Sequence, residues 1–133
     1  MTENHDFNRT LEDLEGEVWG EADFKSSLVL KSHALRKKPI NSLTNEDLRL
    51  LISQDLGLTY VISIAIERLS MNPFNSGDLF VGDLLATILK LNKKFLSDNP
   101  EIATEIDLIV KNAKEIIKEM ETRLENHNTT QEY

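Results

Sequence analysis

Clustered carboxylates are the feature of this sequence that most resembles a catalytic or metal-binding site. Five of them lie within residues 11–21: Glu12, Asp13, Glu15, Glu17 and Glu21. Adjacent acids such as Glu12 and Asp13 can hydrolyse a glycosidic bond or hold a hard metal ion when both carboxylates converge on one point. Neighbouring side chains on a helix point about 100° apart, so an adjacent pair does not converge by itself. The sequence therefore predicts neither a metal site nor a catalytic pair.

Other acids lie further along the chain. Asp47 belongs to a second adjacent pair and stands three residues after Thr44, which is the spacing of a helix capping box. Asp78 and Asp83 flank Phe80 in a turn-rich segment, and their simplest roles are in turns or caps. Neither group predicts a catalytic site.

The three histidines do not indicate catalysis either. His5 and His127 lie near the ends of the chain, and His33 lies beside Ala34 and Leu35, where a half-buried structural role is expected. The sequence contains no Gly-rich phosphate loop, no nucleophile elbow and no metal-binding pair of histidines. We therefore expect no enzymatic activity, no catalytic residues and no cofactor.

The net charge of −8 is unevenly distributed. Residues 1–23 hold eight acids and one base, whereas residues 24–40 hold five bases and no acid. The five bases are Lys25, Lys31, Arg36, Lys37 and Lys38. We expect these two segments to neutralise each other on the folded surface rather than to bind phosphates. The acidic balance argues against direct binding of nucleic acid.

The composition also bears on the compartment. The chain has no Cys, which excludes disulfides and thiolate zinc sites. Its first residues are polar and acidic, so no signal peptide is expected. No apolar run reaches the roughly 18 residues of a transmembrane helix. We expect a cytoplasmic protein with no membrane contact.

Helical patterns cover nearly the whole chain and would position these side chains. Thr10 can cap a short helix over residues 11–15, which Gly16 would end. A second helix is expected to begin at residue 26 or 27 and to stop by residue 38, because Pro39 disfavours helical geometry in the residue before it. Thr44 caps a third helix, which is expected to end at Gly57.

The apolar segment over residues 58–69 is the predicted centre of the fold. Its residues are apolar on nearly all sides, which is typical of a buried helix. Its β-branched residues would also suit a strand. We expect a helix, because no second strand-like segment is available to pair with it.

Shorter elements precede a long C-terminal helix. After a loop over residues 72–77, helical segments are expected at residues 84–91 and 93–97. Pro100 suits the first position of the last helix, in which apolar residues recur every three or four positions from Ile102 to Leu124. We expect this stripe to pack on its own domain, so a monomer is favoured over a homodimer.

Together these segments predict an all-α protein, a single compact helical domain of five to seven helices with a long C-terminal helix. The helical domain is expected over residues 11–126. A flexible N-terminus at residues 1–10 and a flexible tail at residues 127–133 are expected to flank it.

Six blocks of residues carry a family resemblance. They are LEDLEGEVWG from Leu11, HALRKKPI from His33, LTNEDLRLL from Leu43, QDLGL from Gln54, AIERL from Ala65 with Asn72-Pro73 after it, and GDLFVGDLL from Gly77. In this order and spacing, they resemble the immunity proteins of bacterial contact-dependent growth inhibition (CDI) systems. The resemblance covers about residues 11–91, and the C-terminal helix carries no recognised motif.

The resemblance implies a binding protein with no activity of its own. CDI immunity proteins bind the C-terminal toxin domain that a neighbouring cell delivers, and they block its active site. Many such toxins are nucleases, and an acidic inhibitor would suit a cationic nuclease cleft. The expected toxin-facing residues are Glu12, Asp13, Glu15, Glu17, Glu21 and Asp23, with Asp78 and Asp83 as further candidates. Trp19 is either a core anchor or part of this interface.

Two other functions stay open. A helical adaptor or regulatory protein could dimerise through the C-terminal helix as a coiled coil. A small acid-dependent enzyme would require at least two carboxylates that converge in a cleft.

Overall fold

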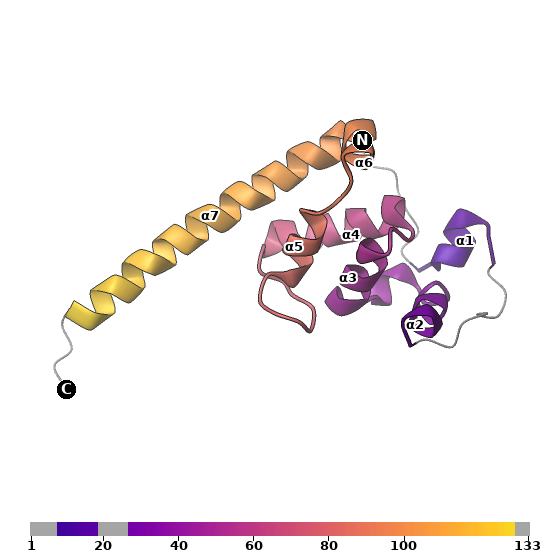
Figure 1. The fold of residues 1–133 in the computed structure, drawn as a ribbon, viewed down its shortest axis with the longest axis horizontal. Coiled ribbons are helices and arrows are strands. Elements are labelled where there is room, and N and C mark those ends of the chain that lie inside the picture. The colour runs from indigo at the N-terminus through magenta and orange to yellow at the C-terminus, as the bar shows by residue number, and fades with distance from the viewer. Residues whose placement is uncertain (1–7, 19–26, 130–133) are drawn as a thin grey trace. The chain divides into compact units, whose positions relative to one another are not determined.

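The computed structural model describes residues 8–18 and 27–129. Within these ranges the chain forms seven α-helices and one short 3-10 helix, and it has no β-strand beyond an isolated bridge between Thr10 and Pro39 (Figure 1). The prediction of an all-α protein with a long C-terminal helix is confirmed. The chain divides into two compact units, residues 1–90 and 91–133, which are described separately. A single domain over residues 11–126 stays a prediction.

Helix α1 (Leu11–Glu15) forms where the sequence predicts it. Thr10 and Asp13 build a reciprocal capping box, in which each side chain accepts a hydrogen bond from the backbone N–H of the other residue. Gly16 ends the helix with a φ of 68°, in the left-handed region. The Tyr60 hydroxyl donates to the Leu14 carbonyl at 3.1 Å and so ties this short helix to the middle of its unit.

Helix α2 (Ser27–Leu35) ends four residues before Pro39, within the predicted limit at residue 38. The 3-10 helix η1 (Ile40–Ser42) follows that proline and buries Ile40 completely. The predicted cap at Ser26 falls outside the described residues.

Helix α3 (Asn45–Ser53) packs against α2, α4 and α5 and lies between them in Figure 1. Its start is the predicted capping box of Thr44 and Asp47. Its predicted end at Gly57 is wrong, because the helix stops at Ser53 and Asp55 already adopts a φ of 55°. Gly57 instead precedes the next helix, with a left-handed φ of 60°.

The apolar segment forms helix α4 (Leu58–Met71), which confirms the prediction of a helix rather than a strand. Helix α5 (Asp83–Ile88) ends three residues short of the predicted residue 91. Apolar side chains of α3, α4 and α5 supply most of the buried core of this unit. The fully or almost fully buried ones are Leu48, Leu51, Ile52, Val61, Ile62, Ala65, Leu69, Leu84 and Ile88.

The second unit contains α6 (Lys93–Asp98) and α7 (Pro100–Thr129), which pack against each other. The Asn92 side chain caps α6 by accepting the Phe95 N–H at 2.7 Å. Helix α7 runs three residues past the predicted boundary at residue 126, so the first part of the predicted tail is helical. Packing of its apolar stripe on its own domain and dimerisation through it both stay predictions.

Candidate protein-interaction site

The acidic first segment is bound to the basic one through Arg36. This side chain is only 2% exposed, and its guanidinium pairs with the Glu15 carboxylate. It also donates to the Glu17 carbonyl oxygen at 2.9 Å. The arginine thus holds the C-terminal end of α1 and the residues just after it against the end of α2.

Two other acids of this segment have partners inside the protein. The Glu12 carboxylate lies 2.9 Å from the Lys37 ammonium group. Asp13 uses its carboxylate in the Thr10 capping box. The predicted neutralisation of the two charged segments is therefore confirmed for Arg36 and Lys37.

The remaining acids of the first segment differ from these three. Glu17 is exposed, and its carboxylate makes no ion pair with a residue in the described ranges. Glu21 and Asp23 lie outside the described residues, and so does Trp19. The choice between a core and an interface role for Trp19 stays open.

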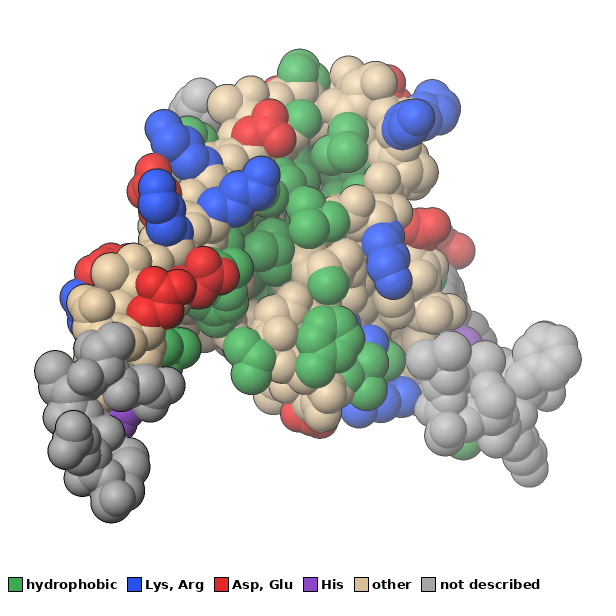
Figure 2. All heavy atoms as spheres, turned by 60° about the vertical axis from the view of Figure 1, so that its left-hand side comes forward, with side chains coloured by type: hydrophobic (Ala, Val, Ile, Leu, Met, Phe, Trp, Pro, Cys, Tyr) green, Lys and Arg blue, Asp and Glu red, His purple; other side chains and the backbone are tan. Residues whose placement is uncertain are grey.

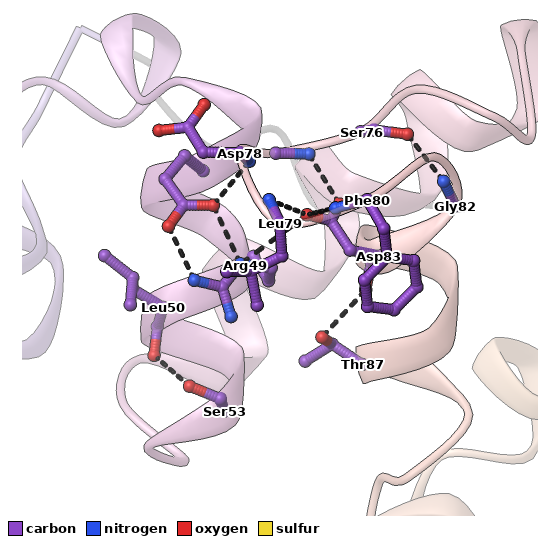
Figure 3. A network of polar contacts seen from close by, with 12 residues as sticks. Arg49, Leu50, Ser53, Ser76, Asp78, Leu79, Phe80, Gly82, Asp83 and Thr87 are labelled. Atoms are coloured by element: carbon purple, nitrogen blue, oxygen red, sulfur yellow. Dashed lines mark hydrogen bonds and ion pairs between the residues drawn. The ribbon is translucent and has the colours of Figure 1, made fainter.

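A second polar cluster centres on Asp83, the first residue of α5. Its side chain is 1% exposed, and its two oxygens accept the backbone N–H groups of the loop before the helix (Figure 3). Gly77 donates to one oxygen at 2.6 Å, while Leu79 and Phe80 donate to the other at 2.9 and 3.4 Å. Asp83 therefore holds three backbone N–H groups of this loop in place.

Helix α3 holds the same loop from the other side. Arg49 and Glu46 form a bidentate ion pair, with N–O distances of 2.8 and 2.5 Å. One Glu46 oxygen also accepts the Asp78 N–H at 2.9 Å, and the Arg49 Nε lies 3.9 Å from Asp83. These contacts connect α3, the loop and α5 through charged groups.

The pKa values follow from these contacts. The hydrogen bond from Arg49 lowers the pKa of Glu46 from 4.5 to about 2, against the opposing effect of burial and with help from the Asp78 N–H. The Glu46 carboxylate in turn raises the pKa of Arg49. Burial alone would raise the pKa of Asp83, but the N–H donors of the loop and the Arg49 charge outweigh it and lower that pKa. All three groups are charged at neutral pH.

The loop that these groups hold presents apolar side chains to solvent. Leu79, Phe80 and Val81 are 64%, 58% and 79% exposed. Figure 2 shows one face of the molecule, on which hydrophobic side chains stand at the surface among acidic and basic ones. We call Leu79, Phe80 and Val81 the apolar loop triplet.

The structure separates the two later candidate acids. The Asp78 side chain is exposed next to the triplet and is accessible to a partner. Asp83 is buried and serves the loop backbone, so its carboxylate is not accessible in this structure. These contacts with the loop backbone agree with the role in a turn or cap that the sequence predicts for Asp83.

Comparison with known proteins decides the family. Residues 13–106 match the family of CDI immunity proteins. The chain belongs to this family. No curated protein and no solved structure matches it.

The family match covers the Arg36–Glu15 pair and the whole cluster around Asp83. It begins inside α1 and ends at Ile106, in the first turns of α7, so most of that helix lies beyond it. The resemblance read from the sequence ended near residue 91, whereas the match extends through α6.

Other findings concern metals and membranes. In residues 8–18 and 27–129, no group of three or more His, Cys, Asp or Glu side chains is placed to hold a metal ion. Among the helices that the structure describes, none combines the length and the apolar character needed to cross a membrane.

Sequence reasoning missed the burial of Arg36 and the exposure of the apolar loop triplet. A basic side chain in a lysine-rich segment is normally exposed, so nothing local distinguished Arg36 from Lys37. The triplet had a usable signal, because three apolar residues lie between two glycines in a turn-rich segment. Such a short run has no helical period that would direct it into a core.

Proposed function

We propose that this protein binds the toxin domain of a CDI system and neutralises it by covering the toxin's active site. The observation that carries this proposal is the family match over residues 13–106. Neutralisation by binding needs a complementary surface and no catalytic group on the inhibitor. We place this function in the cytoplasm, where the toxin would act, with no direct contact to nucleic acid or membrane.

Charge supports a toxin with a cationic active-site cleft, as in a nuclease. The net charge of −8 would accelerate encounter with such a cleft and favour it over anionic competitors. Asp13, Glu15, Glu17 and Asp78 are exposed, and of these four only Glu17 and Asp78 have carboxylates without an ion pair or capping contact to a described residue. Glu21 and Asp23 remain candidates from the sequence. Glu12, Asp13, Glu15 and Asp83 have internal partners, which makes them the weaker candidates.

A rescue experiment tests the function. The C-terminal domain encoded by the open reading frame directly upstream is expressed from an inducible promoter, with and without this chain. We expect growth only when both are present, and we expect one molar equivalent of the purified chain to abolish the toxin's activity in vitro. Continued growth arrest, with soluble and folded chain present, would rule the proposal out.

Charge reversal tests the acidic surface. We expect Glu17→Lys and Asp78→Lys to slow association with the toxin domain several-fold at low salt and less at high salt, because screening weakens long-range attraction. Glu121→Lys is the matched control, since Glu121 is an exposed acid of α7 outside the family match. Equal association rates for all three variants would move the contact away from these acids.

A further inference from the structure

The apolar loop triplet is an exposed hydrophobic surface without a structural use in its own unit. Leu79, Phe80 and Val81 are consecutive, and each keeps more than half of its side chain in solvent. Single exposed apolar residues are ordinary, but three in succession on an ordered loop expose a contiguous patch. Such patches commonly mark sites of protein–protein contact.

The loop that carries the triplet is held in one shape by acceptors on α5, on α3 and within the loop itself. Asp83 accepts the N–H groups of Gly77, Leu79 and Phe80. The Ser76 hydroxyl oxygen accepts the Gly82 N–H at 2.7 Å, and Glu46 accepts the Asp78 N–H at 2.9 Å. The backbone is thus fixed before any partner arrives, which lowers the entropy lost on binding.

We propose that the apolar loop triplet is the hydrophobic anchor by which this chain docks on its toxin domain. This proposal rests on the proposed function, because it takes the toxin domain as the partner. Phe80 would enter an apolar pocket of the toxin, with Leu79 and Val81 beside it. Asp78 would face a basic group at the rim of that pocket. An aromatic anchor with a charged rim is the usual form of a binding hot spot.

Charge favours a toxin domain over other occupants of this surface. A symmetric contact with a second copy would bring the Asp78 carboxylates of both copies close together, where they repel. An anionic lipid surface would repel the same carboxylate. A domain with basic groups around its active site complements it.

The experiment measures the Kd of the full-length chain for the purified toxin domain encoded directly upstream. We expect the double variant Leu79→Ser/Phe80→Ser to bind about 30-fold more weakly or worse, as for the loss of a hot spot. The conservative double variant Leu79→Met/Phe80→Leu should stay within a few-fold of wild type, because it keeps apolar area on the loop. Leu108→Ser is the matched control, since Leu108 on α7 is 62% exposed. Circular dichroism and Tm confirm that each variant is folded.

Each outcome decides the proposal. If wild type binds and the Ser double variant binds equally well, the anchor is wrong while the proposed function stands. If wild type neither binds nor rescues, both fail. A wild-type dimer in sedimentation that the Ser variant dissociates, with an unchanged Kd for toxin, assigns the triplet to self-contact and overturns the proposal. Selective weakening by the Ser variant, with the other two near wild type, supports it.

Discussion

The guanidinium of Arg36 pairs with the Glu15 carboxylate, 21 residues earlier in the chain. The same guanidinium donates to the Glu17 carbonyl oxygen at 2.9 Å. The acidic first segment is therefore part of the fold through Glu15, and only some of its carboxylates are available as a surface charge. Substituting an internally paired acid such as Glu15 therefore affects stability, whereas substituting an unpaired surface acid tests binding.

Replacing Arg36 should destabilise the protein. Arg36→Gln leaves Glu15 without its cation and the Glu17 carbonyl without its donor, so we expect the free energy of unfolding to fall by about 2–4 kcal/mol. Lys37→Gln is the control, because the Lys37–Glu12 pair involves an exposed lysine and should contribute less than about 1 kcal/mol. Urea unfolding measures both variants. Equal losses would contradict a structural role for the buried arginine.

Two glycines with nearly the same backbone offer a matched test of packing. Gly16 and Gly57 have φ values of 68° and 60°, so Ala is strained at both. A Cβ at Gly16 meets nothing within 4 Å, whereas one at Gly57 would lie 2.8 Å from the buried Leu11 side chain. We expect Gly57→Ala to lose about 1–3 kcal/mol more stability than Gly16→Ala in urea unfolding. Equal losses would mean that Leu11 can shift without cost.

Removing the acceptor of the loop should loosen it. Asp83→Asn keeps the size of the side chain but replaces one acceptor oxygen with an NH₂ group, so either the Gly77 N–H or the N–H groups of Leu79 and Phe80 lose their acceptor. We expect a loss of about 1–3 kcal/mol and faster hydrogen exchange at the loop amides that lose it. Asp78→Asn should leave both quantities unchanged, because the Asp78 side chain is exposed. Slow exchange in the Asp83 variant would show that other contacts hold the loop.

Acid should weaken the α3 contact with the loop. The folded-state pKa of Glu46 is about 2, below the ordinary value of 4.5. Its contribution to stability is therefore complete above about pH 4.5 and is lost as the pH falls toward 2. The lowered pKa of Asp83 acts in the same direction. We expect Glu46→Gln to be less stable than wild type at neutral pH and to lose less stability on acidification.

Urea unfolding at several pH values measures this slope. The exposed acid Glu121 provides a control, since Glu121→Gln should keep the wild-type dependence. A Glu46→Gln slope equal to that of wild type would remove Glu46 from the acid response.

Features that depend on a few neighbouring residues could be predicted from the sequence. The predicted capping box at Thr44 needs only a hydroxyl and a carboxylate three residues apart, and the predicted cap at Thr10 has the same spacing to Asp13. The helix predicted over residues 58–69 followed from the lack of a partner strand, and the observed helix extends to Met71. The end of α3 could not be read this way, because Asp55 turns the chain with a positive φ that its residue type does not demand.

The candidate site depends on contacts between segments far apart in the chain, which a linear pattern does not reveal. The acidic segment and Asp78 were found because charge is visible in the sequence. The burial of Asp83 depends on the loop folding back onto it. The loop is in turn held by Glu46, which lies 32 residues before Asp78 in the chain. Which acids are available to a partner thus becomes visible only in the folded chain.

The contacts that hold the loop with the apolar triplet are made to its backbone. Asp83 accepts backbone N–H groups, which every residue type except proline supplies. Leu79, Phe80 and Val81 can therefore be exchanged for other residues while the loop keeps its shape and the core keeps its packing. Substitutions at these three positions therefore change the exposed surface with little effect on the stability of the fold. If the triplet contacts a partner, a change in that partner can be matched here without destabilising the protein.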